Sequence, residues 1–251
     1  TPGRGGGGGI NNSGTATLTN STVSRNRSDG RASGGIYNDG TMTLTNSTVS
    51  ANAGGGIYND AGTLTLTNST VSGNSTLSGG GIVNNGPMHL PHSTVSGNAA
   101  RIGGGIEHSG NANLFNTTIT KNRGSAGGGG GIDNNGTMTL TNSTVSANSG
   151  DFFGRGGGIA NRGTLTLINS TVSGNSTGGS ADDGGIANSG TANLFSTTIT
   201  NNIGTTVGGI TNGSGATFNF QNTILAGNRD ETITSSRTMI AQGRSFQMAT
   251  T

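Results

Sequence analysis

The chain has 251 residues, of which 51 are glycine and only 9% are charged, and its formal net charge is +2. Such a nearly neutral composition excludes the dense basic surface by which proteins hold nucleic acid. The absence of cysteine excludes disulfides and thiolate metal sites, and no apolar run is long enough to span a bilayer.

A glycine-rich cassette recurs nine times along the chain, and its clearest copy is residues 54–74. An isoleucine after the glycines marks each copy, and successive markers are 21 to 27 residues apart. The markers are Ile10, Ile36, Ile57, Ile82, Ile106, Ile132, Ile159, Ile186 and Ile210. A period of this length is typical of a solenoid, in which each copy is one coil that buries its apolar side against its neighbours.

Three short segments follow one another in each copy: Gly-Gly-Ile-x-Asn, then Thr-x-Thr-Leu-Thr, then Thr-Val-Ser. In residues 63–67, threonine and leucine alternate with the period of two that indicates a strand with one buried face. We therefore predict three short strands per coil and about nine coils. Four inward apolar side chains per coil would form a narrow, continuous core.

Asparagine recurs at three places in each copy. One set lies two residues after the marker isoleucine, with His108 as its exception, and a second lies two residues after the inner leucine, with His92 and Ser196 as exceptions. The third set lies three residues after the valine and is present in all nine copies. Asparagine tolerates left-handed backbone, and its amide can bond to main chain and to the next coil. We predict three corners, each with a hydrogen-bonded asparagine ladder.

The Gly-Gly-Gly-Ile and Asn-x-x-Val-x-x-Asn pattern resembles the right-handed parallel β-helix of the pectin-lyase-like superfamily. More narrowly, it resembles the repeats of polymorphic outer-membrane proteins and related bacterial surface proteins. The resemblance covers roughly residues 5–228 and implies an all-β solenoid. That superfamily includes lyases, glycosidases, adhesins and phage tail proteins, so the resemblance implies a fold and leaves several functions open.

The repeat also defines the expected domain organisation. We expect one parallel β-helix domain at 1–228 and a non-repeat tail at 229–251 that caps the C-terminal end. The first coil begins near residue 5 without a polar capping element, although repeat arrays usually need one. We therefore expect the sequence to be a piece of a longer protein.

Glu107 and Asp133 are the candidate catalytic residues. Each follows a marker isoleucine, so the two should lie one coil apart on the outer face of the first sheet, within ~5 Å of each other. That arrangement suits the carboxyl pair of a retaining glycosidase or a Ca²⁺ site. The alternative is two exposed acids at a variable outward position.

Other acidic residues have simpler interpretations. Asp39 and Asp60 lie at turns beside glycine, which is ordinary turn chemistry. Asp182 and Asp183 resemble the paired aspartates of β-helix polygalacturonases, but the Gly-His-Gly and Arg-x-Lys motifs of that family are missing.

The histidines do not suggest a metal site. His92 and His108 replace corner asparagines, and we expect them to act there as hydrogen-bonding groups. His89 lies between Pro87 and Pro91, in a coil that we expect to be locally irregular. We predict no bound metal and no cofactor. Because the coils differ in length by only six residues, their turns are expected to enclose little of a sugar.

The outward residues of the third segment form a two-column hydroxyl array over eight coils. Its members are Thr22, Ser24, Thr48, Ser50, Thr70, Ser72, Thr94, Ser96, Thr118, Thr120, Thr144, Ser146, Thr171, Ser173, Thr198 and Thr200. A flat threonine lattice spaced ~6.7 Å along the strand and ~4.8 Å between coils resembles the surface of ice-binding β-solenoids. Threonine is also simply a good strand residue.

Low charge, short turns and repeat architecture favour a non-enzymatic structural or adhesive β-helix, such as a stalk, adhesin or filament segment. Ice binding by the hydroxyl array and polysaccharide lyase or glycosidase activity are the alternatives. The expected partners are a second copy end to end, a polysaccharide or cell surface, or ice, with no nucleic acid. The expected location is extracellular or at the cell surface.

Overall fold

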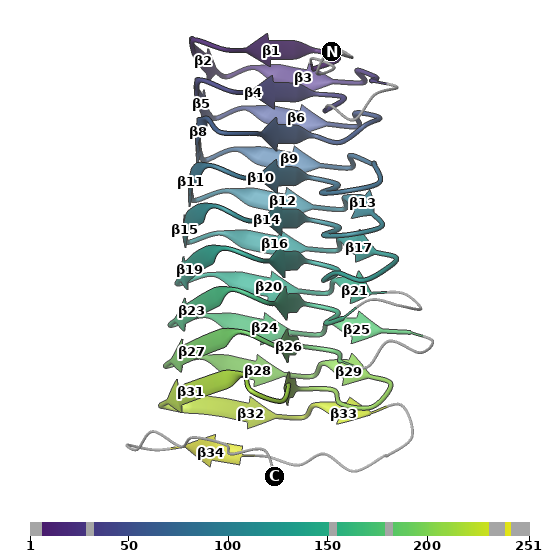
Figure 1. Cartoon of the computed structure of the whole chain (residues 1–251), viewed down its shortest axis with the longest axis vertical. Helices are drawn as coiled ribbons and strands as arrows, with labels where there is room; N and C mark the ends of the chain where they lie inside the picture. Colours follow the sequence, from purple (N-terminus) through teal and green to yellow (C-terminus); the bar gives the residue numbers. More distant parts are fainter. Residues whose placement is uncertain (1–6, 29–32, 151–154, 179–182, 231–238, 242–251) are drawn as a thin grey trace.

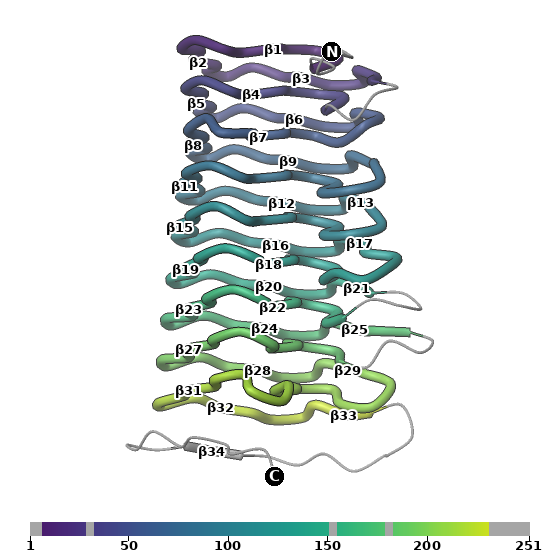
Figure 2. The backbone as a smooth tube through the Cα atoms, in the orientation of Figure 1, coloured from purple at the N-terminus to yellow at the C-terminus, as the bar shows by residue number. Residues whose placement is uncertain are grey.

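The computed structural model describes residues 7–28, 33–150, 155–178 and 183–230, together with the backbone of 239–241. Within these ranges every secondary-structure element is a β-strand, and strands from successive repeats stack in columns (Figure 1). Figure 2 shows the backbone winding from β1 at one end to β32 at the other. The chain is an all-β parallel β-helix, which confirms the predicted fold class.

Three main sheets run along the solenoid, each with nine strands taken from successive repeats. We call them sheets A, B and C. Sheet A contains β1 (Ile10–Asn12), β4 (Ile36–Asn38), β7 (Ile57–Asn59), β10 (Ile82–Asn84), β14 (Ile106–His108), β18 (Ile132–Asn134), β22 (Ile159–Asn161), β26 (Ile186–Asn188) and β30 (Ile210–Asn212). Sheet B contains β2 (Thr15–Thr19), β5 (Thr41–Thr45), β8 (Thr63–Thr67), β11 (Pro87–Pro91), β15 (Asn111–Phe115), β19 (Thr137–Thr141), β23 (Thr164–Ile168), β27 (Thr191–Phe195) and β31 (Thr217–Gln221).

Sheet C has nine parallel strands from the repeats and one further strand. It contains β3 (Thr22–Ser24), β6 (Thr48–Ser50), β9 (Thr70–Ser72), β12 (Thr94–Ser96), β16 (Thr118–Thr120), β20 (Thr144–Ser146), β24 (Thr171–Ser173), β28 (Thr198–Thr200), β32 (Thr223–Ala226) and β34 (Met239–Ala241). The last of these pairs antiparallel with β32, so backbone from the predicted tail lies along the final coil of sheet C.

A fourth, minor sheet follows the third corner and was not predicted from the sequence. This sheet D contains β13 (Ala99–Ala100), β17 (Arg123–Gly124), β21 (Ser149–Gly150), β25 (Ser176–Thr177), β29 (Ile203–Gly204) and β33 (Arg229–Asp230). Its two-residue strands are paired through the main chain, and their side chains follow no pattern from coil to coil. The last strand extends two residues beyond the predicted domain boundary at 228.

The core lies between sheets A, B and C and is aliphatic except in the last coil, where Phe218 and Phe220 take the inward positions. In a middle coil, Ile82, Met88, Leu90 and Val95 are all 0% exposed. Register is maintained from coil to coil, so that isoleucine stacks on isoleucine and valine on valine. Burying such side chains stabilises a coil by roughly 1.5–3 kcal/mol each.

Two of the three predicted asparagine ladders are confirmed. At the corner between sheets A and B, Asn38 Nδ2 donates to Asn59 Oδ1 at 2.7 Å. At the corner after sheet C, Asn98 Nδ2 donates to Asn122 Oδ1 at 3.0 Å and to Val71 O at 3.0 Å. Both ladders are buried. Each side-chain amide therefore bonds to main-chain groups of the turn that water cannot reach.

The predicted ladder at the corner between sheets B and C is not formed as a buried ladder, although Asn116 Nδ2 lies 3.4 Å from His92 Nδ1 at the surface. The residues in this position are exposed and adopt left-handed backbone, with φ of 49° at Asn46 and 54° at His92. The stacked side chains here belong to the next residue: Ser69 Oγ accepts from the backbone N–H of Ser47, and itself donates to Thr67 O at 2.8 Å. Asparagine at this corner therefore supplies backbone conformation, and serine supplies the ladder.

The proline-containing coil is irregular on one side only. Its strand β11 pairs with β15 at five register positions but with β8 at only two. Pro87 and Pro91 have no N–H to donate, which shortens the pairing on the β8 side. His89 lies on the exposed face of this strand.

Candidate functional site

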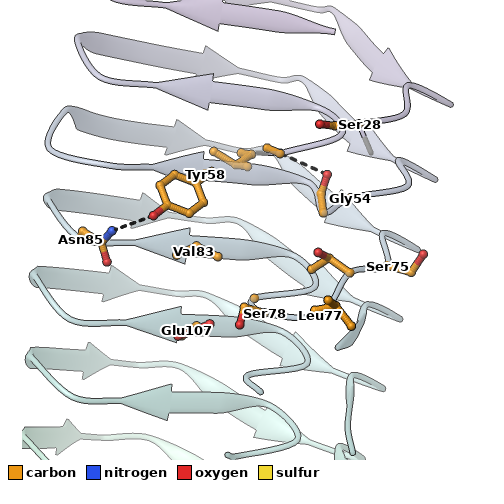
Figure 3. Close-up of a pocket in the computed structure, with 14 residues that line it drawn as sticks. Ser28, Gly54, Tyr58, Ser75, Leu77, Ser78, Val83, Asn85 and Glu107 are labelled. Atoms are coloured by element: carbon orange, nitrogen blue, oxygen red, sulfur yellow. Dashed lines mark hydrogen bonds between the residues drawn. The ribbon is translucent and has the colours of Figure 1, made fainter. Parts of the chain in front are cut away.

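The outer face of sheet A carries an open-sided groove with a volume of about 810 Å³. It crosses several coils, and Figure 3 shows its labelled side chains arranged over the strands of sheet A. The residues that line it are Ser28, Ser33, Gly54, Gly55, Ile57, Tyr58, Ser75, Thr76, Leu77, Ser78, Gly79, Val83, Asn85 and Glu107. The expectation that the short turns enclose little is corrected in this region.

Tyr58, Val83 and Glu107 form the floor of the groove and belong to the column of residues that follow the marker isoleucines. Tyr37, Tyr58, Val83, Glu107 and Asp133 are successive register partners in this column. The rings of Tyr37 and Tyr58 are stacked, with centroids 5.7 Å apart and planes 14° apart. These are the only two tyrosines in the sequence, and parallel pairing places them side by side because they occupy the same position in adjacent repeats.

The corner between sheets A and B forms one side of the groove. Asn85 Nδ2 donates to the Tyr58 hydroxyl at 3.4 Å, and Asn85 Oδ1 accepts from Ser109 Oγ at 2.7 Å. In the preceding coil the Tyr37 hydroxyl donates to Asp60 Oδ2 at 3.0 Å. Both tyrosine rings are therefore held by polar contacts at their hydroxyl ends. Asp39, the other predicted turn acid, is exposed at this corner.

The segment between β9 and β10 forms the opposite side. Ser75, Leu77 and Ser78 lie across from Asn85 in Figure 3, with Tyr58 and Val83 between the two sides. Leu77 is 71% exposed. This segment passes close to Val83 of sheet A, and the close approach requires glycine. Gly79 has φ +58°, and a Cβ at this position would lie 2.2 Å from Val83 Cγ2.

Glu107 and Asp133 are register partners on adjacent strands, as predicted. Their environments differ, however, because Asp133 is only 2% exposed whereas Glu107 is half-buried and faces the groove. Asp133 thus takes the outward position that was expected, but the alternative of two exposed acids is wrong for this residue. Arg162 covers it, forming an ion pair with Asp133 Oδ1 and donating a second hydrogen bond to Gly127 O.

Both carboxyl groups have raised pKa values. Burial is the main cause of the raised pKa of Glu107, and the nearby charge of Asp133 adds to it, while a hydrogen bond with Ser78 and the charge of Arg162 act in the opposite direction. Burial also raises the pKa of Asp133, against the charge and hydrogen bond of Arg162 and a hydrogen bond from Asn135. Glu107 Oε2 is buried and has no hydrogen-bond partner among the described residues.

This geometry limits the chemistry that the pair can perform. A retaining glycosidase needs one carboxylate that is free to attack the sugar, whereas Asp133 is buried in an ion pair and does not line the groove. Within the described ranges, no three His, Cys, Asp or Glu side chains are grouped so that they could hold a metal ion. The arrangement presents one half-buried acid, Glu107, and one aromatic ring, Tyr58, on the same groove floor with Val83 between them, which is suited to binding.

The histidines and Asp183 lie elsewhere. His108 is a buried member of the ladder between sheets A and B, where Asn84 Nδ2 lies 3.1 Å from its Nδ1, as the sequence predicted. His92 contacts Phe115 edge to face, with centroids 5.6 Å apart. Asp183 is buried and accepts a hydrogen bond from Thr211, while Asp182 lies outside the described residues.

The predicted hydroxyl array is assembled as a continuous lattice on sheet C. From β3 through β28, the first outward position of each strand is threonine and the second is serine or threonine, and each pairs with the same position in the next coil. Most of these side chains are half-exposed, on either side of a buried valine or isoleucine. The lattice ends at β32, where Ile224 and Ala226 take the two outward positions.

The sequence analysis missed Tyr58, Asn85, Ser78 and Arg162. A signal existed for the tyrosines, since Tyr37 and Tyr58 occupy the same position in adjacent cassettes. No comparable signal existed for Ser78, which lies in a turn that varies between coils, or for Arg162, because the corner position that it occupies holds different residue types in other coils.

No protein-family model matches the chain, and no curated protein or solved structure was found to be similar to it. The fold itself defines the class of the protein, which is a parallel β-solenoid repeat protein. Within the described residues, no helix is long and apolar enough to span a membrane.

Proposed function

We propose that this protein is a non-enzymatic β-helix that binds a polysaccharide in the groove on sheet A and acts as an adhesive or stalk segment at a cell surface. The observation that carries the proposal is the combination of the groove with the Tyr58 ring, which is fixed at its hydroxyl end by Asn85. Saccharide rings present apolar C–H faces, and aromatic rings in open grooves provide flat apolar surfaces for such faces.

The walls of the groove fit the same class of ligand. Ser75, Thr76 and Ser78 on one side and Asn85 on the other offer hydroxyl and amide groups for hydrogen bonds to sugar hydroxyls. The residues that line the groove come from several successive coils, from Ser28 to Glu107, so a long chain has room to lie across the strands. A polymer is thus a better fit than a small enclosed ligand.

Binding is favoured over hydrolysis by the state of the two acids. Asp133 is neutralised by Arg162 and buried, so it offers no free nucleophile. Glu107 alone could act as a general acid, but no second carboxyl group lines the groove in the described residues.

Binding of neutral, amino and acidic oligosaccharides to the full chain, measured by calorimetry, tests the proposal. Tyr58→Ala should weaken binding by about fivefold, since aromatic contacts contribute ~0.5–1.5 kcal/mol, and Tyr58→Phe should weaken it less. Phe195→Ala is the matched control, because Phe195 is an exposed aromatic on sheet B. Release of reducing ends that is lost in Glu107→Gln would instead establish an enzyme, and absence of any saccharide binding would refute the proposal.

The sheet C lattice supports a second candidate, ice binding. Its in-register columns from β3 to β28 have the ~4.8 Å and ~6.7 Å spacings of a regular strand lattice. Thermal hysteresis that is abolished by Thr94→Tyr, and kept by Thr65→Tyr on sheet B, would favour it. Ordinary freezing behaviour of the wild type would rule it out.

Surface location and end-to-end association are further parts of the proposal. The resemblance to bacterial surface repeats supports the location, and a full-length gene encoding a signal peptide, anchor or barrel domain would test it. Filaments that lengthen with protein concentration in electron micrographs would support association, whereas a strictly monomeric rod at high concentration would count against it.

A further inference from the structure

Among the described residues that line the groove, Glu107 is the only one with a carboxyl, amino or guanidinium side chain. Its Oε2 atom is buried without a hydrogen-bond partner in the described part of the chain. A buried carboxylate oxygen without a donor is unfavourable, so a cation that contacts the part of the Glu107 side chain facing the groove would stabilise this carboxylate more than it would an ordinary surface acid.

The nearest cation does not fill this role. Arg162 is committed to Asp133 and to Gly127 O, and it is not among the residues that line the groove. Ser78 hydrogen-bonds to the Glu107 side chain but leaves Oε2 unpaired. The groove therefore presents one carboxyl group that is not ion-paired, two coils from the Tyr58 ring and on the far side of Val83.

We propose that the polysaccharide bound in this groove carries primary ammonium groups, as a polymer of 2-amino sugars does, and that one ammonium donates to Glu107. This inference rests on the proposed saccharide-binding function and specifies its ligand class. A sugar ring lies against Tyr58, and its hydroxyl groups bond to Asn85 and Ser78. An acidic polysaccharide is disfavoured, because the described residues of the lining offer it a carboxylate and no cation.

A saccharide fits the groove better than a lysine-containing peptide. Peptides commonly bind solenoids and sheets by adding a strand to an open edge, but the floor strands β7, β10 and β14 are paired on both sides. The groove instead offers an aromatic face and a row of hydroxyl groups. Polylysine is nevertheless a useful probe, because it shares the ammonium and lacks the ring.

Calorimetry with the full chain at near-neutral pH tests this inference, using glucosamine oligomers, their N-acetylated forms, oligogalacturonate and polylysine. Glucosamine oligomers should bind at least about tenfold more tightly than the N-acetylated forms, as a charge-assisted hydrogen bond allows. Glu107→Gln should remove this preference while retaining binding of the N-acetylated forms. Asp39→Asn, which removes an exposed acid outside the groove, should keep the preference.

Two results would overturn the inference without touching the proposed function: equal binding of the amino and N-acetylated oligomers, or a preference that survives Glu107→Gln. Binding of polylysine that matches glucosamine oligomers and depends on Glu107 would replace the saccharide by a basic peptide. Absence of binding to every saccharide would refute the proposed function itself. Thermal unfolding of each variant checks that the fold is retained.

Discussion

Arg162, at the corner that follows β22, forms an ion pair with Asp133 on the neighbouring strand β18. The side chain of Asp133 is 3% exposed and that of Arg162 is 34% exposed, so a buried acid is neutralised by a cation that closes the site from outside. The two neighbouring acids therefore differ: Asp133 is buried in an ion pair, whereas Glu107 lines the groove.

We predict that Arg162→Ala destabilises the fold by about 2 kcal/mol. Loss of the cation leaves a buried carboxylate uncompensated, which costs ~3–5 kcal/mol in a fully buried pair and less where one partner is partly exposed. The free energy of unfolding from urea titration at neutral pH measures the effect.

The control for this experiment is Arg101→Ala, because Arg101 is exposed and should change stability little. Asp133→Asn combined with Arg162→Ala should recover much of the loss, since the buried charge is then removed. Equal stability of Arg162→Ala and wild type would contradict the structural role.

The two asparagine corners should respond differently to the same substitution. Asn98 is 1% exposed, donates to Asn122 and Val71, and accepts from Asn74. Asn98→Gly leaves several buried groups unpaired, each worth ~1–3 kcal/mol, so we expect a loss of roughly 3 kcal/mol or more.

Asn142 is exposed and has φ +51°. Glycine adopts this backbone without strain, so Asn142→Gly should change the free energy of unfolding by less than about 0.5 kcal/mol. Chemical denaturation of the two variants in parallel makes the comparison. Similar losses would mean that the exposed corner asparagines also carry structural hydrogen bonds.

The fold was predictable because its core repeats. Alternating Thr and Leu in 63–67 and the marker isoleucines defined strands and inward faces without any knowledge of the turns. The minor sheet could not be predicted, since pairs such as Ala99–Ala100 and Arg123–Gly124 share a backbone register but no side-chain pattern. Asn46 was wrongly predicted to belong to a ladder, because asparagine is favoured both by left-handed backbone and by side-chain hydrogen bonding at corners.

The site was less predictable for a related reason. Glu107 and Asp133 could be placed on adjacent strands from their repeat position. Their different burial depends on Arg162 and on the segment around Gly127, neither of which recurs in other coils. A repeat predicts what all coils share, whereas the groove is built from what distinguishes a few of them.

Glu107→Gln should increase the stability of the unliganded protein at neutral pH. A raised pKa means that the native state holds the Glu107 proton more tightly than the unfolded chain does. Stability from this group is therefore present at low pH and is lost as pH rises from the unfolded-state pKa through the raised native-state pKa.

Urea titrations of wild type and Glu107→Gln across this acidic range measure the difference. The two should be closest in stability at the lowest pH and should diverge in favour of the variant as pH rises. Asp39→Asn is the control, as an exposed acid at the neighbouring corner. A variant that becomes relatively less stable as pH rises would show that the carboxylate is stabilised in the native state.

His108→Asn should remove an acid sensitivity from the fold. Asn84 Nδ2 also donates to Gly86 O, and Asn84 Oδ1 accepts from Asn59, so the amide orientation is fixed and presents a donor to His108 Nδ1. Nε2 faces Thr137 O at 3.1 Å and therefore carries the proton of the neutral ring.

Protonation of Nδ1 would place two donors against each other inside the ladder. Burial lowers the pKa of His108, against the opposing effect of backbone hydrogen bonds from its ring. The unfolded chain then binds the proton more readily than the native state, so stability rises with pH up to the ordinary histidine pKa near 6.5 and is lost below it.

Asparagine restores the ladder residue found in the adjacent coils and has no such titration. Thermal or urea unfolding between about pH 5 and pH 7 should therefore show a steeper loss on acidification for wild type than for His108→Asn. His92→Asn, at an exposed corner, should leave that slope unchanged, and parallel slopes for wild type and His108→Asn would show that the buried imidazole accommodates its proton.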